Sequence, residues 1–192
     1  MSCIISLKQN GVLYLAADSM VTKGDYVCKE FDYSTKIFRS HTNPKVMFAI
    51  AGQIHFAQAV KNRLVVPENI EEEVNEEYIL TNIVPKLRDL EYGETNEYTI
   101  LFAYENKCWN IDKYGCVTEV GDTFVEGSLS LLAEGCLDAL KDYDMLPETR
   151  IRKAMDILIS KCSTVEYPCA IMNSLNEDVY VFDKIGKMQQ IN

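Results

Sequence analysis

The chain has 192 residues, of which 47% are hydrophobic and 25% are charged, and its formal net charge at pH 7 is −10. This length is enough for one domain with a sizeable core, and the composition is typical of a folded globular protein. The acidic balance, without a basic stripe, argues against a nucleic-acid partner, and the short apolar runs and lack of a signal-peptide pattern predict a cytoplasmic protein with no membrane contact.

Cysteine and histidine spacings indicate neither a disulfide framework nor a metal site. The seven cysteines contain no Cys-x-x-Cys pair, and their odd number favours free thiols. His41 and His55 lack metal-ligand spacing, and His55 falls in a predicted helix, where a packing or surface role is expected. The sequence implies no metal and no organic cofactor.

The first predicted element is a β-hairpin. Two apolar runs, 4–7 and 12–17, flank a turn that ends in Asn10-Gly11. Asn-Gly between strand-forming runs is a strong hairpin signal. The second run ends at Asp18, whose carboxylate can turn back toward the start of the first strand.

Ser2 stands immediately before this hairpin. If Met1 is removed, Ser2 carries a hydroxyl and a free α-amine on one residue. That amine has a reference pKa of about 7.7–8.0, so it can act as a base near neutrality and activate the hydroxyl. An ordinary edge hairpin that keeps Met1 fits the same residues.

The rest of the chain predicts separate blocks of strands and helices. Strands are expected at 26–29, 34–39 and 45–52, followed by helices at 54–64 and 69–90, the second kinked or divided at Pro85. A three-strand meander follows at 97–104, 107–112 and 116–120. Residues 124–128 lead into helices at 130–143 and 147–162, and strands at 170–173 and 179–183 close the chain. Such segregated blocks favour an α+β fold, in one domain over 1–192.

The opening stretch resembles the proteasome β-subunit superfamily, including the HslV-type peptidases. Those chains begin with a mature Thr or Ser, a strand, a Gly turn and a second strand that ends in Ala-x-Asp-Ser, often followed by x-x-Thr-x-Gly. The matching residues here, without a gap, are Ser2, Gly11, Ala16-Ala17-Asp18-Ser19, Thr22 and Gly24. The family's nucleophile therefore falls on Ser2 and not on Cys3. The resemblance implies an N-terminal nucleophile (Ntn) hydrolase with a four-layer αββα sandwich of two antiparallel sheets.

Further catalytic residues follow from the same resemblance. Lys36, in Thr35-Lys36-Ile37-Phe38, matches the family's catalytic lysine, and Asp18 would pair with it. Gly52 matches a glycine whose N–H can donate to an oxyanion. Ser128 matches a serine that lies near the nucleophile's amine. The simpler roles are an exposed edge-strand lysine, whose removal would spare the fold, a turn-capping Asp18, a small turn residue at Gly52 and a helix N-cap at Ser128.

The resemblance also assigns substrate contacts. Thr22 matches a threonine that pairs with the substrate main chain, and Val21, Ile50 and Ile54 would line an apolar first specificity pocket, although each could be simple core. One departure concerns the family's Asp-x-x-Ser-Gly-Gly motif after the last long helix. The corresponding residues 162–167 read CSTVEY, as in HslV-type chains that lack the full motif.

The sequence therefore predicts a proteasome-like N-terminal serine peptidase that acts on a protein or peptide substrate. By resemblance it would form a homo-oligomeric ring of six or seven subunits, and an ATPase unfoldase is a further partner that the family uses. Two alternatives stay open. The chain could be a catalytically silent ring subunit that keeps Met1, or an Ntn amidohydrolase that acts on a small amide.

Overall fold

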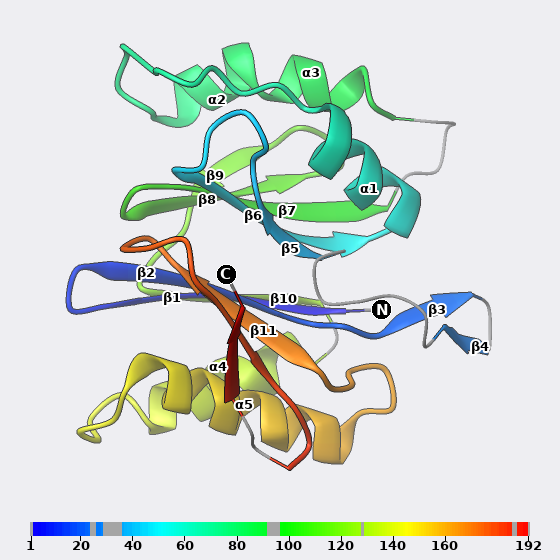
Figure 1. Cartoon of the computed structure of the whole chain (residues 1–192), viewed down its shortest axis with the longest axis vertical. Coiled ribbons are helices and arrows are strands. Elements are labelled where there is room, and N and C mark those ends of the chain that lie inside the picture. The colour runs from blue at the N-terminus through cyan, green and yellow to red at the C-terminus, as the bar shows by residue number, and fades with distance from the viewer. Residues whose placement is uncertain are drawn as a thin grey trace.

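The computed structural model describes residues 2–23, 26–28, 36–91, 97–127, 129–185 and 188–191 (Figure 1). In this part of the chain the strands form two large antiparallel sheets. The strand order of one is β10-β1-β2-β11-β12-β13, built from β1 (Cys3–Gln9), β2 (Val12–Asp18), β10 (Thr123–Gly127), β11 (Cys169–Asn173), β12 (Val179–Phe182) and β13 (Met188–Ile191). The order of the other is β5-β6-β7-β8-β9, built from β5 (Ile37–Arg39), β6 (Val46–Gly52), β7 (Tyr98–Tyr104), β8 (Lys107–Asp112) and β9 (Val117–Glu119).

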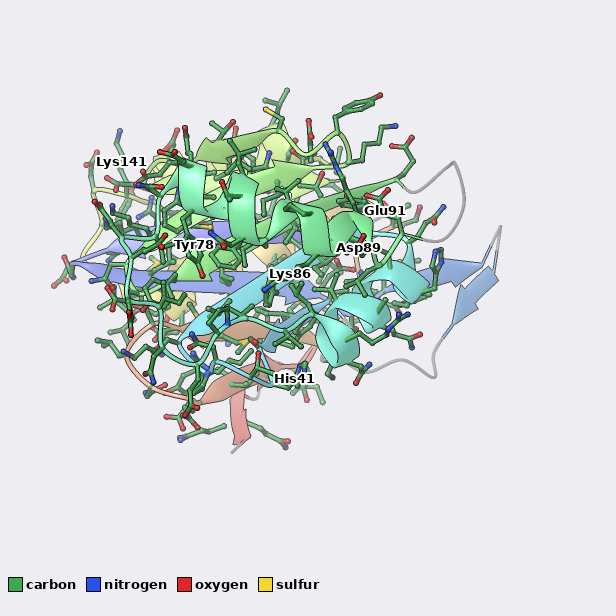
Figure 2. The ribbon with its side chains drawn as sticks, turned by 90° about the horizontal axis from the view of Figure 1, so that it is seen from above. His41, Tyr78, Lys86, Asp89, Glu91 and Lys141 are labelled. Carbon is green, nitrogen blue, oxygen red and sulfur yellow. The ribbon has the colours of Figure 1, made fainter. Side chains whose placement is uncertain are left out.

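The two sheets are stacked, and helices cover their outer faces (Figure 1). The β5–β9 sheet is covered by α1 (Ile54–Arg63), α2 (Glu76–Asn82) and α3 (Val84–Arg88), and the β1-containing sheet by α4 (Ser130–Ala139) and α5 (Pro147–Lys161). Figure 2 looks down on the α1–α3 layer, with Asp89 and Glu91 following the end of α3. The expected α+β fold and its four-layer αββα arrangement are confirmed. Within the described ranges, no helix has the length and apolar character to span a bilayer.

Three hydrophobic cores fill the three spaces between the four layers. Strand alternation explains how one apolar run supplies two of them, because successive side chains point to opposite faces. In β6, Phe48 and Ile50 face the helical layer, whereas Met47 and Ala49 face the opposite sheet. The continuous apolar sequence at 46–51 is therefore the pattern of a strand buried on both faces.

The opening hairpin forms as expected. β1 and β2 pair from Ile4↔Ala17 to Gln9↔Val12, and the two turn residues, Asn10 and Gly11, have φ values of 54° and 77°. Positive φ at both positions is typical of the tight turns that Asn-Gly favours. The second strand is followed by a short ribbon of β3 (Val21–Lys23) and β4 (Tyr26–Cys28), which projects from one side of the molecule (Figure 1).

Some predicted helix boundaries were wrong. Residues 69–75 are not helical, because the Asn75 side chain accepts the Tyr78 N–H at 2.9 Å and starts α2 at Glu76. The division near Pro85 is confirmed, with α2 and α3 separated at Ile83. The helix expected to reach residue 143 ends at Ala139, where the guanidinium of Arg150 donates to the Leu137 carbonyl at 2.7 and 2.9 Å.

Three short strands, β3, β10 and β13, were not predicted from the sequence. Of these, β10 matters most, because it pairs with β1 over Cys3↔Gly127 to Leu7↔Thr123. The expected strand at 34–39 is observed only as β5, and residues 29–35 lie outside the described part of the chain. The single-domain organisation over 1–192 stays a prediction.

Candidate active site

Ser2 lies at the start of β1 with only 6% of its surface exposed. Its carbonyl packs against Gly127 at the end of β10, where a Cβ atom would lie 1.9 Å from the Ser2 oxygen. Gly127 also has a φ of +105°, which side-chain-bearing residues rarely adopt. This glycine therefore lets β10 approach and hold the residue that carries the candidate nucleophile.

Asp18 and Lys36 form a buried ion pair beside Ser2. The Lys36 ammonium lies 3.0 Å from both carboxylate oxygens of Asp18, and the two side chains are 4% and 0% exposed. The same carboxylate accepts the Cys3 N–H at 2.8 Å and the Met20 N–H at 3.0 Å. Asp18 thus fixes both the residue after Ser2 and the lysine. The alternative of an exposed edge-strand lysine is wrong.

Burial and charge set the titration behaviour of this cluster. Burial lowers the pKa of Lys36 from its usual range, and the Asp18 carboxylate opposes that shift. Burial, followed by the charge of Asp18, raises the pKa of the Cys3 thiol, and the same two causes raise that of Cys169. Both thiols are therefore held in the neutral form, which is a poor nucleophile. This chemistry disfavours the thiols of Cys3 and Cys169 as nucleophiles.

A pocket of about 270 Å³ opens on one side of Ser2. Three predicted pocket residues, Val21, Ile50 and Ile54, line it together with Lys36 and Gly52. Its remaining walls, which were not predicted, come from Met20, Gln53, His55 and Ala57. The pocket therefore has a mixed lining, in which the apolar side chains of Met20, Val21, Ile50, Ile54 and Ala57 lie together with the polar residues Ser2, Lys36, Gln53 and His55.

A second pocket, of about 290 Å³, opens on another side of Ser2. It shares Ser2 and Gly52 with the first pocket, and its other lining residues are Ala51, Glu97, Tyr98, Thr99, Glu126 and Gly127. None of these others was predicted as a site residue. Ser2 and Gly52 therefore lie where the two pockets meet.

Gly52 occupies a position that excludes any side chain. Its φ is +132°, and a Cβ atom would lie 2.2 Å from the Glu97 carbonyl oxygen. The next residue, Gln53, donates its N–H to that carbonyl at 3.1 Å, and α1 begins at Ile54. This tight strand-to-helix turn keeps Gly52 exposed beside Ser2, with its backbone open to a bound molecule.

Two predicted site residues are only partly placed or not placed. Thr22 lies in β3, paired with Val27, but its side chain is outside the described part. Ser128 is outside the described residues altogether. Across the ranges that are described, no group of three or more His, Cys, Asp or Glu side chains could hold a metal ion.

Because Gly127 lies so close to Ser2, we expect a single methyl group added at position 127 to lower the stability of the fold strongly. Gly127→Ala should lower the free energy of unfolding by about 2–4 kcal/mol, through backbone strain and the clash with the Ser2 carbonyl. Gly121→Ala is the matched control, because its Cβ would meet nothing within 4 Å. Urea unfolding measures both, and equal midpoints for the two variants would contradict the packing described.

The ion pair predicts a second difference in stability. Lys36→Met should lower the free energy of unfolding by about 3–5 kcal/mol, because it leaves the buried Asp18 carboxylate without its cation. The control is Lys107→Met, which breaks the exposed pair with Glu73 and should cost less than about 1 kcal/mol.

Adding Asp18→Asn to Lys36→Met should restore part of the lost stability, since no uncompensated charge is then buried. The account of the pair is wrong if Lys36→Met is no more destabilising than Lys107→Met.

Comparison with solved structures identifies the fold of the chain. No family model and no curated protein matches the chain. Among solved structures, it is similar to Thiobacillus denitrificans BPH in complex with Epoxomicin, with a TM-score of 0.72 and 17% identity over 89% of this chain and 97% of that one.

Two further solved structures have a similar fold. The eukaryotic HslV from Trypanosoma brucei matches with a TM-score of 0.64 and 19% identity, over 89% of this chain and 98% of that one. Anbu, an ancestral beta-subunit from Yersinia bercovieri, matches with a TM-score of 0.70 and 14% identity, over 96% and 88%. The chain therefore has the fold of the proteasome-type N-terminal nucleophile hydrolases, the superfamily that its opening residues resemble.

Proposed function

We propose that this protein is an N-terminal serine peptidase, in which Ser2 becomes the first residue after Met1 is removed. The observation that supports this most is the buried Asp18–Lys36 pair at Ser2. Asp18 binds the Lys36 amine and the Cys3 N–H, and Lys36 and Ser2 line the same pocket. A buried ion pair stabilises a fold only weakly, whereas strongly perturbed groups in a pocket are typical of functional sites.

The chemical step uses groups on two residues. The Ser2 Oγ attacks the carbonyl carbon of a peptide bond, and its proton passes to the Ser2 α-amine. The positive charge of Lys36, held by Asp18, lowers the pKa of that amine by repulsion, so that more of it is the free base. The amine then gives the proton to the departing peptide amine, the C–N bond breaks, and water hydrolyses the Ser2 ester.

Gly52 is proposed to stabilise the negative charge that develops on the carbonyl oxygen. It lies beside Ser2 in both pockets and carries no side chain to shield its N–H. Removal of one hydrogen-bond donor from the oxyanion hole of a serine protease costs about 2.7–4 kcal/mol of transition-state stabilisation. The pocket that Val21, Ile50 and Ile54 line would take the side chain on the acyl side of the bond, and these three side chains would favour an apolar one.

The protein's surface supports assembly into a homo-oligomeric ring. Between α4 and α5 lies a hollow of about 570 Å³ with apolar walls, and Leu131 in α4 is 83% exposed. Covering such an apolar surface is what subunit interfaces do. A cytoplasmic location is part of the proposal, and so is an ATPase unfoldase, because a ring that encloses its sites needs substrates delivered as unfolded chains.

Maturation and the nucleophile are tested together. Protein with a free Ser2, verified by intact mass, should cleave peptides that have an apolar acyl-side residue, and Ser2→Ala should lose about 10³-fold or more in kcat. Protein that retains Met1 should be equally impaired, because acylation of the amine removes the base. Epoxomicin, which BPH binds in its solved structure, should bind only the form with a free Ser2.

Verified Ser2 protein that cleaves no peptide, or a Ser2→Ala variant with unchanged kcat, would refute the proposal. Cleavage of small acyl amides without cleavage of peptides would instead favour the amidohydrolase alternative.

The assembly is tested separately from the chemistry. Native mass spectrometry at micromolar concentration should find a closed homo-oligomer, and Leu131→Glu should shift it toward the monomer, since it places a charge on the exposed apolar surface. Leu175→Glu is the control, because Leu175 is 72% exposed but lies outside that hollow. A monomer of about 22 kDa as the sole species would contradict the ring.

A further inference from the structure

The second pocket at Ser2 differs in charge from the first. Its lining residues include two acidic ones, Glu97 before β7 and Glu126 in β10, whereas the first pocket is lined by Lys36 and by no acidic residue. The two pockets share Ser2 and Gly52, so a peptide bond placed there has the first pocket on one side and the second pocket on the other. The substrate residues on the two sides of the bond therefore contact protein residues of different charge.

The two carboxylates differ in how far their charge is compensated. Glu97 forms an ion pair with Lys113, whose ammonium also lies over the Tyr114 ring. Glu126 is half-buried, and one of its oxygens accepts the Gly127 N–H at 3.2 Å. No cation among the described residues forms an ion pair with Glu126. Within the described part of the chain, the charge of Glu126 in this pocket is therefore without an ion-pair partner.

The side chain of Ser2 is the second feature that points to a ligand here. Ser2 lines both pockets, and no residue in the described ranges forms a hydrogen bond with its hydroxyl. A hydroxyl that the described residues leave without a partner, at the junction of two pockets, is suited to a bound molecule. Ser2 and Glu126 line the same pocket.

We infer that the second pocket is a subsite for a cationic group on the leaving-group side of the scissile bond, with Glu126 as its specificity-determining residue. The inference rests on the proposed function. If the acyl-side residue fills the first pocket, the residue that follows the bond extends from the same carbonyl in the other direction, into the second pocket with its two acidic residues. A lysine or arginine side chain in that position would pair with Glu126 as a charge-assisted hydrogen bond.

The overall charge of the protein acts in the same direction. With a formal net charge of −10, the protein attracts cationic peptides before contact, and that long-range part weakens as salt screens it. The local part, between a substrate cation and the half-buried Glu126, is screened less. A preference that depends on Glu126 therefore separates the subsite from general attraction.

The test uses three peptides that differ only in the residue after the scissile bond. That residue is lysine, norleucine, which matches the lysine stem without charge, or glutamate. Protein with a verified free Ser2 should cleave the lysine peptide with a kcat/KM about fivefold above that of the norleucine peptide, and the glutamate peptide more slowly than either. Product analysis by mass spectrometry confirms that one bond is cut in all three.

Two variants move the charge of the subsite in opposite directions. Glu126→Gln keeps an oxygen that can accept the Gly127 N–H but removes the charge, so the lysine-to-norleucine ratio should fall toward one. Lys113→Met removes the partner of Glu97 and frees a second negative charge, so the ratio should rise. Glu68→Gln, at an exposed position outside both pockets, makes the same change in net charge and should leave the ratio unchanged.

The outcomes separate the subsite from the proposed function. Equal cleavage of the three peptides, or a ratio that Glu126→Gln leaves unchanged, overturns the subsite while the peptidase stands. A preference for lysine on the acyl side of the bond instead also overturns it, because the cation would then occupy the first pocket. Failure to cleave any of the three peptides overturns both.

Discussion

The ion pair of Asp18 and Lys36 is the interaction on which the rest of the site depends. One carboxylate accepts four hydrogen bonds from three donor groups, two from the Lys36 ammonium and one each from the backbone N–H groups of Cys3 and Met20. It thereby joins the start of β1, the end of β2 and the residue before β5, which belong to the two facing sheets. A buried pair has a large desolvation cost, and only such complete hydrogen bonding offsets it. The same contacts that satisfy the carboxylate set the position of Ser2 relative to the lysine.

The shape of the site depends on two places where backbone segments pack closely against each other at a glycine. Gly127 lets β10 lie against the Ser2 carbonyl, and Gly52 lets the strand-to-helix turn lie against the Glu97 carbonyl. Both have positive φ, and both border the second pocket. The two glycines thus bring the ends of β1, β6 and β10 together. The Ser2 hydroxyl and the Gly52 N–H therefore lie at the junction of the two pockets.

Local sequence signals predicted the hairpin, the buried strand at 45–52 and the separate blocks of strands and helices, whereas the four-layer stacking and the pocket residues Val21, Ile50 and Ile54 were expected from the family resemblance alone. The Asn-Gly turn and the apolar runs act over short distances and need no tertiary context. The second pocket could not be predicted, because Glu97 and Glu126 reach Ser2 only through the β6–β7 and β1–β10 pairings. β10 itself was missed, since its mixed burial lacks a clear alternation. The burial of Lys36 also depends on the stacking of two sheets, which no local pattern encodes.

The central claim is that Ser2 carries the acyl group during catalysis, and mapping the acylated residue tests it most directly. Protein with a free Ser2 is mixed with an activated ester of a short apolar peptide, stopped with acid, and digested for tandem mass spectrometry. The account predicts acyl label on residue 2, as the ester or as the amide formed when it moves to the neighbouring α-amine, and no such label on Ser2→Ala, which keeps the amine but lacks the hydroxyl. Label on Cys116, an exposed thiol, with none on residue 2, or equal labelling of Ser2→Ala, would contradict it.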